Sequence, residues 1–160
     1  MYFEFATSNR IVFGPGSLQT VESAASDLGR RAMVVTGRSS QRAGPLMRLL
    51  DKKNIATNHF KVEEEPTVAV LENGLSLARE NKTDFVIGYG GGSAIDTAKA
   101  IAALMRQSGP VLDFLEVIGD GKPLTHRPIP MIAIPTTAGT GAEVTCNAVL
   151  RSEEHRVKVS

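Results

Sequence analysis

Four short runs typical of strands, each separated from the next by a segment with helical spacing, constrain the fold of this chain more than any other feature. The runs cover residues 32–36, 57–62, 84–88 and 131–134, and all except the second are mainly apolar. Runs that are apolar throughout are typical of strands buried on both faces, and strands that alternate with helices form βαβ units. The sequence therefore predicts an α/β fold in which helices cover both faces of a parallel sheet.

The segments between these runs predict helices, and the two ends of the chain predict β-hairpins. The expected helices cover residues 17–28, 43–54, 66–78 and 93–105. Aromatic and β-branched residues within 1–13 favour a hairpin or an edge pair. Alternation of β-branched and polar residues across 143–160 favours a second hairpin, in which Val149, Val157 and Val159 could bury one face.

A glycine-rich turn follows the third run, residues 84–88. Residues 88–96 read GYGGGSAID and join the strand to an Ala-rich helix. Ligands of parallel α/β sheets bind outside the carboxyl ends of the strands, where this turn falls. Glycines allow close approach of the backbone or a positive φ, and the next helix offers unpaired N–H groups, so the turn predicts a pyrophosphate site. The alternative is a tight turn with a Ser93–Asp96 capping box, which leaves the consecutive glycines unexplained.

A second segment rich in hydrogen-bond donors follows the fourth run, residues 131–134. Residues 134–143 read IPTTAGTGAE and combine three hydroxyls with two glycines. Hydroxyls and backbone N–H groups are suitable neutral donors for phosphate, ribose or carboxamide groups. The alternative is a surface turn marked by Pro and Gly. Two donor-rich segments at the same edge of one sheet favour a ligand site over that alternative.

The segments 88–102 (GYGGGSAIDTAKAIA) and 134–145 (IPTTAGTGAEVT), in this order and at this spacing, resemble the iron-containing (group III) alcohol dehydrogenase family. Further similar segments lie at residues 10–16, 65–67 and 127–130. The resemblance implies that residues 1–160 form a Rossmann-like domain that binds NAD or NADP. The positions that match the family's cofactor contacts are Gly90, Gly91, Gly92, Ser93, Asp96, Thr136, Thr137, Thr140 and Lys158.

The resemblance also implies a divalent metal, iron or zinc, held by an Asp and three His of a C-terminal helical domain. This chain ends at Ser160, before any of those ligands. The spacing of His59, His126 and His155 matches no metal pattern, and we expect these histidines to be solvated. We therefore expect neither metal ligands nor catalytic residues here: the chain corresponds to the cofactor half of an enzyme, truncated relative to the family and inactive alone.

The end of the first apolar run bears on which nicotinamide cofactor is bound. A carboxylate at this position of a Rossmann-like site binds the ribose 2′-OH of NAD. Here the position is Gly37, followed by Arg38, Ser39 and Ser40, which supply a cation and two hydroxyls but no acid. The sequence predicts a preference for NADP over NAD. The alternative is that Gly37 is only a turn glycine and that Ser39 or Ser40 caps a helix.

Composition excludes several other classes of function. The 160 residues carry a net charge of +1, which argues against binding to nucleic acid or an anionic membrane. No apolar stretch approaches a membrane span, no signal peptide is recognisable, and the single cysteine, Cys146, fits a reducing, cytoplasmic compartment.

We expect NAD(P)-dependent hydride transfer to or from a small alcohol, aldehyde or ketone. Enzymes similar to glycerol dehydrogenase, maleylacetate reductase or dehydroquinate synthase remain alternatives, as does a nucleotide-binding fragment without catalysis. The resemblance suggests a homodimer, for which residues 2–13 would provide the edge strand.

Overall fold

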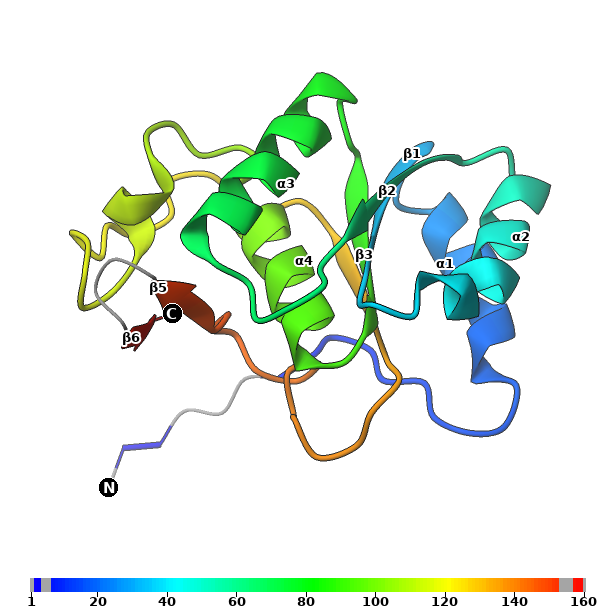
Figure 1. Cartoon of the computed structure of the whole chain (residues 1–160). Coiled ribbons are helices and arrows are strands. Elements are labelled where there is room, and N and C mark those ends of the chain that lie inside the picture. The colour runs from blue at the N-terminus through cyan, green and yellow to red at the C-terminus, as the bar shows by residue number, and fades with distance from the viewer. Residues whose placement is uncertain (1, 4–6, 153–156, 160) are drawn as a thin grey trace.

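A parallel four-stranded sheet organises the chain, whose computed structural model describes residues 2–3, 7–152 and 157–159. The strand order is β2-β1-β3-β4, and every neighbouring pair is parallel (Figure 1). The strands are β1 (Arg31–Thr36), β2 (Ala56–Lys61), β3 (Phe85–Gly90) and β4 (Met131–Pro135). The order reverses between β1 and β3, and a crevice for a ligand opens outside the carboxyl ends of the strands at such a point.

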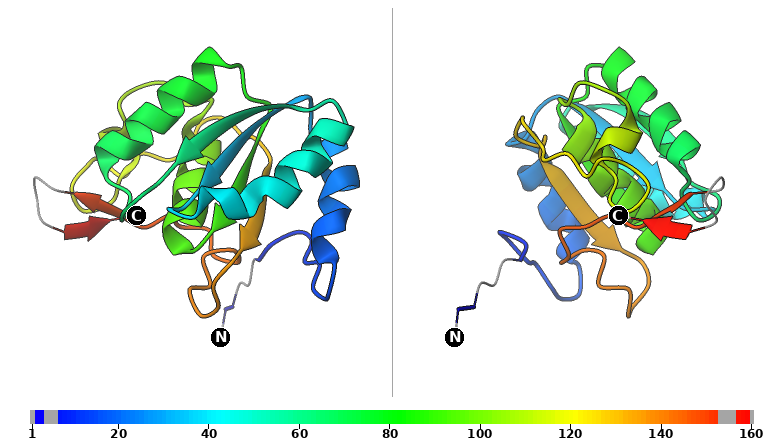
Figure 2. Two further views of the ribbon diagram at one scale, coloured as in Figure 1. Left: turned by 45° about the vertical axis from the view of Figure 1, so that its right-hand side comes forward. Right: turned by 90° about the vertical axis from the view of Figure 1, so that its left-hand side faces the viewer.

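Helices cover both faces of this sheet, as the sequence predicts (Figure 2). One face packs against α1 and α2, and the other packs against α3 and α4. The helices are α1 (Val21–Ser26), α2 (Gly44–Lys52), α3 (Val68–Glu80) and α4 (Gly92–Leu104). Short 3-10 helices are η1 (Ser17–Thr20), η2 (Ser40–Ala43) and η3 (Val111–Phe114). The Rossmann-like α/β architecture is thereby confirmed.

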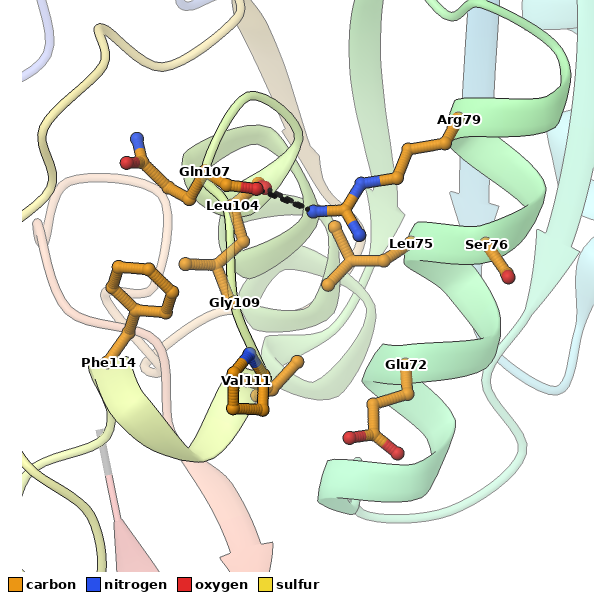
Figure 3. Close-up of a pocket in the computed structure, with 10 residues that line it drawn as sticks. Glu72, Leu75, Ser76, Arg79, Leu104, Gln107, Gly109, Val111 and Phe114 are labelled. Carbon is orange, nitrogen blue, oxygen red and sulfur yellow. Dashed lines mark hydrogen bonds between the residues drawn. The ribbon is translucent and has the colours of Figure 1, made fainter.

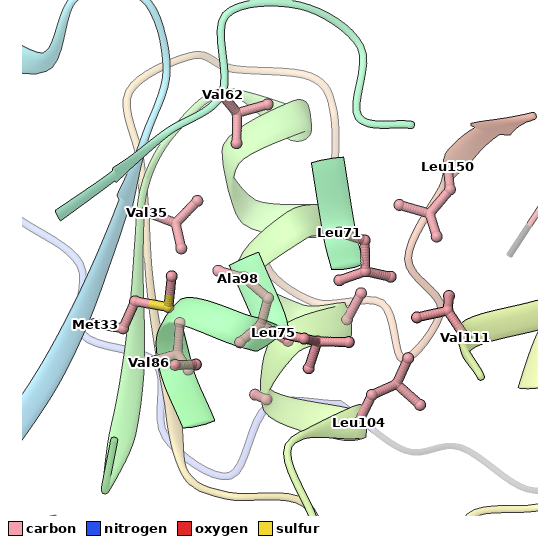
Figure 4. Packing of buried hydrophobic residues seen from close by; sticks show 14 of the residues in the cluster. Met33, Val35, Val62, Leu71, Leu75, Val86, Ala98, Leu104, Val111 and Leu150 are labelled. Carbon is pink, nitrogen blue, oxygen red and sulfur yellow. The ribbon is translucent and has the colours of Figure 1, made fainter. Parts of the chain in front are cut away.

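Alternation along β1 explains why its central residues, 32–35, are all apolar. Ala32 and Val34 contribute to the core beneath α1 and α2, whereas Met33 and Val35 contribute to the core beneath α3 and α4 (Figure 4). All four are fully buried. A strand that buries both faces favours apolar side chains on each face, so residues 32–35 form a continuous apolar run.

Two helix starts differ from those that the sequence predicts. The segment from residue 17 begins as the 3-10 helix η1 and becomes α-helical only at Val21. Pro66 lies before α3 rather than within it, because Thr67 is the N-cap and its hydroxyl accepts a hydrogen bond from the Val70 N–H at 3.2 Å. A threonine hydroxyl satisfies an otherwise unpaired N–H of the first turn, which proline cannot do.

The C-terminal hairpin is confirmed, with β5 (Leu150–Ser152) antiparallel to β6 (Val157–Val159). Its buried side chains are not the predicted set. Val159 is buried with Leu150 against the core of α3 and α4, whereas Val149 and Val157 are 37% and 39% exposed. The contact with α3, and not the alternation of residue types along the hairpin, decides which of its side chains are buried.

The predicted N-terminal hairpin is not observed. Residues 2–3 and 7–13 contain no strand, and residues 4–6 lie outside the part that the structure describes. Aromatic and β-branched residues favour a strand only where a partner strand is available, because strand propensity depends on its packing context. The edge strand expected for a homodimer is therefore absent from the described residues of this segment.

Candidate cofactor site

The first half of the site is the glycine turn, residues 90–93, where β3 passes into α4. Gly91 is the N-cap of α4, and no described side chain caps this end. The first intrahelical bond runs from the Ile95 N–H to the Gly91 carbonyl at 3.1 Å. The N–H groups of the three residues between them have no intrahelical acceptor. The alternative of a Ser93 capping box is wrong, because Ser93 is already the second residue of the helix.

Close packing explains two glycines at the end of β3. A Cβ on Gly88 would lie 2.9 Å from the Cβ of Ala98, and a Cβ on Gly90 would lie 2.8 Å from the Cβ of Ala94. Both distances are too short, so α4 lies directly on β3 only because these positions have no side chain. Gly88 and the glycines at 90–92 all lie outside the left-handed region. Positive φ is therefore not the reason for these glycines.

The second half is the threonine loop, residues 136–149, between β4 and β5. The Thr136 N–H donates to the Gly90 carbonyl at 2.9 Å, which starts the loop at the glycine turn. A Cβ on Gly91 would lie 3.3 Å from Thr137 Oγ1. The equivalent Cβ on the next glycine would lie 3.5 Å from the Cγ2 of Thr140. The glycine turn and the exposed threonines thus form one continuous surface at the carboxyl edge, at the bottom of Figure 1.

The end of β1 lies beside the same turn. The backbone nitrogen of Gly37 is 3.4 Å from the position of a Cβ on Gly90. No described heavy atom lies within 4 Å of a Cβ on Gly37, and its φ is not positive. A turn therefore does not require glycine here. Ser39 is the N-cap residue of η2 but makes no side-chain cap bond, and Ser40 is the first residue of η2, so neither hydroxyl caps the helix.

Arg38 lies among acidic residues that the sequence analysis did not connect with it. Its Nε donates to the carbonyl oxygen of Glu63, and its Nη2 lies 3.6 Å from Glu64 Oε1. The side chains of Arg38 and Glu64 are 73% and 79% exposed. The Lys61 ammonium bonds the Glu63 carboxylate at 2.7 Å and holds the pKa of Glu63 below its usual range. The parallel register at the end of β2 brings this acidic segment to Arg38.

Two predicted cofactor residues have protein partners. Asp96 Oδ1 accepts from the Lys99 ammonium at 3.1 Å, and both side chains are largely buried. Lys158, on β6, pairs with Glu65 at 2.5 Å. The hydrogen bonds and ion pairs of the described residues join Lys158 to neither the glycine turn nor the threonine loop.

Lys99 contributes a contact that the sequence does not reveal. Its Nζ also donates to Thr145 Oγ1 at 3.0 Å and to the carbonyl oxygen of Asn147 at 2.6 Å. The spacing of Asp96 and Lys99 predicts only their own pair, one helical turn apart. No local sequence signal indicates the contact with the threonine loop, because its partners lie nearly fifty positions further along the chain.

His59 and His126, the two histidines that the structure describes, lie on different parts of the fold. His59 is half-buried within β2, and its Nε2 lies 2.7 Å from Thr36 Oγ1, so the expectation of a solvated side chain is wrong for this residue. His126 lies exposed in a loop, and His155 is outside the described residues. Within residues 2–3, 7–152 and 157–159, no three His, Cys, Asp or Glu groups lie close enough to hold a metal ion. In the same ranges, no helix is long and apolar enough to cross a membrane.

A hollow of about 190 Å³ lies along α3, between this helix, the C-terminal end of α4 and η3 (Figure 3). Arg79 Nη2 donates to the carbonyl oxygens of Leu104 and Gln107, each at 3.0 Å. These bonds satisfy carbonyl groups at the end of α4, a role that basic side chains often fill. The hollow is thus part of the helix packing and does not compete with the carboxyl edge as the cofactor site.

A parallel sheet with a switch between β1 and β3, an uncapped helix N-terminus and a facing hydroxyl-rich loop is the arrangement of α/β proteins that bind nucleotides. The comparisons with known proteins identify the family within this class. The chain belongs to the iron-containing alcohol dehydrogenase family, whose sequence model matches residues 8–160. The resemblance inferred from the two loops is thereby confirmed, and the family consists of oxidoreductases.

Several named relatives and solved structures are similar to this chain. Choline dehydrogenase of Bacillus subtilis (strain 168) is 36% identical over 98% of this chain and 40% of its own length. Lactaldehyde reductase of Escherichia coli (strain K12) is 33% identical over 91% of this chain and 39% of its own length. The structure of sulfoacetaldehyde reductase from Bifidobacterium kashiwanohense in complex with NAD+ matches with a TM-score of 0.83 and 32% identity. The match covers 99% of this chain and 42% of that one, so the chain spans about two fifths of the length of these relatives.

Proposed function

We propose that residues 1–160 are the NAD(P)-binding domain of an oxidoreductase. The reaction is hydride transfer between the nicotinamide cofactor and a small alcohol, aldehyde or ketone. One observation carries the proposal: the threonine loop lies against the glycine turn, because the Thr136 N–H donates to the Gly90 carbonyl at 2.9 Å and a Cβ on Gly91 would lie 3.3 Å from Thr137 Oγ1. The family and the alcohol and aldehyde substrates in the names of the relatives support the same reaction.

The pyrophosphate would bind at the uncapped N-terminus of α4, where the N–H groups and the positive end of the helix dipole favour an anion. The threonine hydroxyls would donate to the phosphates and to the nicotinamide end. The cofactor supplies the hydride chemistry when it is bound, and the protein binds and orients it. The proposed contacts are Gly90, Gly91, Gly92, Ser93, Asp96, Thr136, Thr137, Thr140 and Lys158.

We further propose a preference for NADP(H), through Gly37, Arg38, Ser39 and Ser40. Arg38 would have to leave Glu64, 3.6 Å away, to reach a 2′-phosphate. An ion pair between two largely exposed side chains is worth little, whereas an arginine pairs with a phosphate through two parallel hydrogen bonds. The exchange therefore favours the phosphate, although the nearby acidic segment lowers the gain.

The described residues do not fit the family's metal, because no three candidate ligands lie together. We therefore infer that an iron or zinc ion of this family would be held by residues outside this described set. The chain alone is then expected to bind cofactor without turnover, which is also the behaviour of a non-catalytic nucleotide-binding module. A homodimer and a reducing, cytoplasmic setting, compatible with the exposed thiol of Cys146, complete the proposal.

The test is a titration of the chain with NADPH and NADH, followed by cofactor fluorescence, which the absence of tryptophan keeps clear of protein background. Gly91→Ala would place a methyl group between the two loops without straining the backbone, whose φ is −82°. We expect this variant to bind at least about tenfold more weakly. The matched control is Gly44→Ala, where the nearest atom is Arg48 Nη1 at 3.6 Å. Equal affinity of wild type and Gly91→Ala would contradict the proposed site.

A further inference from the structure

The threonine loop needs a second attachment to the domain. It runs from residue 136 to residue 149, contains no helix or strand and is longer than most connections in compact domains. At its start, the Thr136 N–H donates to the Gly90 carbonyl. Further along, the loop bonds within itself, for example from the Val144 N–H to the Gly141 carbonyl at 3.1 Å. Ser8 Oγ also donates to the Glu143 carbonyl oxygen at 2.9 Å, which ties the loop to the N-terminal segment. Neither this bond nor the internal bonds fix the position of the loop relative to α4.

Lys99 supplies the attachment near the other end. Its ammonium makes three bonds: to Asp96 Oδ1 on its own helix, to Thr145 Oγ1, and to the Asn147 carbonyl. The side chain of Lys99 is 16% exposed, and that of Asp96 is 13% exposed. An ammonium group has three donors, so these three acceptors use its full capacity. Asp96 balances the charge, which allows the amine to be largely withdrawn from water.

We propose that Lys99 is a positioning residue for the cofactor site: it ties the threonine loop to α4 and thereby holds Thr137 and Thr140 against the glycine turn. This inference rests on the proposed function of the site. Lys99 lies two helical turns beyond Gly92, about 10 Å along the helix axis, and its amine is engaged by protein oxygens. It therefore acts through the loop and not as a ligand of the cofactor.

The hydrogen bonds of the Lys99 amine should therefore affect the affinity for the cofactor. If the loop is untied from α4, its threonines sample positions away from the turn, and binding must first order the loop again. Residues that modulate such a coupling typically change affinity by about 3- to 30-fold. Loss of the tether should also be visible without any cofactor, in the backbone of the loop itself.

The experiment compares wild type with Lys99→Met, which keeps the length of the side chain but removes its charge and donors. Lys99→Arg keeps the charge and donors, and Lys122→Met is the matched control, because Lys122 pairs with Asp113 at 2.8 Å away from both loops. Two quantities are measured: the Kd of NADPH and NADH, and hydrogen exchange of the Val144 N–H without cofactor. The Thr136 N–H serves as an internal reference, since Gly90 holds it independently of Lys99.

We expect Lys99→Met to raise Kd about 3- to 30-fold and to speed exchange at Val144 about tenfold or more. We expect Lys99→Arg to recover part of both, and the control to change neither. Unchanged exchange in Lys99→Met overturns the proposal, and weaker binding with unchanged exchange would instead make Lys99 a direct ligand. If Lys99→Met does not fold, Thr145→Val replaces it, because this variant removes one acceptor of the Lys99 amine. The same two quantities, Kd and exchange at Val144, are then measured for Thr145→Val. Wild type that binds neither cofactor refutes the proposed function, while the exchange at Val144 still decides the tether.

Discussion

Replacement of Gly37 by Asp tests whether the end of β1 selects the cofactor. The position is open, since no described heavy atom lies within 4 Å of a Cβ there, and its backbone is not left-handed. The Gly37 nitrogen is 3.4 Å from the Cβ position of Gly90, so the new carboxylate would lie beside the glycine turn. A carboxylate at this point of a Rossmann-like site binds the ribose 2′-OH and repels a 2′-phosphate. We therefore expect Gly37→Asp to fold normally and to prefer NADH.

The magnitude follows from the exposure of the site. Arg38, the next residue, is 73% exposed, so the dielectric constant of water is the appropriate one. A carboxylate and a phosphate dianion about 5–8 Å apart then repel each other by about 1–1.7 kcal/mol. A charge-assisted hydrogen bond to the 2′-OH adds about 1.5–3 kcal/mol in favour of NADH. Together these effects should change the ratio of the two Kd values by at least about 50-fold.

The assay is a fluorescence titration with both cofactors at low and high salt. Gly37→Asn is the control, because it has the shape of aspartate without the charge. The weaker binding of NADPH to Gly37→Asp should recover in part at high salt, because ions screen exposed charges over a few ångströms. A ratio within about threefold of wild type, in a folded Gly37→Asp protein, would refute the assignment of Gly37 to the 2′ position.

Two further predictions concern stability. Gly88→Ala should lower the free energy of unfolding by about 1–3 kcal/mol, because its Cβ would lie 2.9 Å from that of Ala98. Thermal denaturation measures this loss, with Gly44→Ala as the control variant. Equal melting temperatures of the two variants would count against the prediction. Asp84→Asn should also destabilise, by about 1–2 kcal/mol, since Asp84 Oδ2 accepts from two backbone N–H groups and Oδ1 bonds Arg31 at 2.6 Å. The Arg31 guanidinium and those N–H groups lower the pKa of Asp84, so this stability is complete above the unfolded pKa of about 4 and is lost as pH falls through the lowered folded value. The difference between wild type and Asp84→Asn should shrink in acid, and a difference independent of pH would refute this origin.

The sheet and its ligand edge could be predicted because both follow from local patterns and a topological rule. The apolar run of β1 records burial on two faces, and parallel strands place their following loops at one edge. Together these two patterns place the glycine turn and the threonine loop at the same edge of the sheet. The short distance between Thr137 and the Cβ position of Gly91 agrees with this placement.

Contacts between distant positions could not be predicted in the same way. Lys99 meets Thr145 because the threonine loop returns over α4, and Arg38 meets Glu63 because β1 and β2 are in parallel register. Neither contact leaves a periodic signal in the sequence. The prediction of an N-terminal hairpin was wrong because it relied on local composition alone. Residues 2–13 have the composition of strands, but a strand also needs a partner strand, which composition does not reveal.

The glycines at the end of β3 are needed for different reasons. Gly88 and Gly90 are required by the packing of α4 on the sheet, whether or not a ligand binds. Gly91 differs, because its backbone is extended and its missing Cβ faces Thr137 across the space between the loops. Alanine at 88 should therefore cost stability first, and alanine at 91 should cost affinity with little loss of stability. If both variants lost only stability, the glycine turn would be a packing device, and the case for a pyrophosphate there would rest on the helix N-terminus alone.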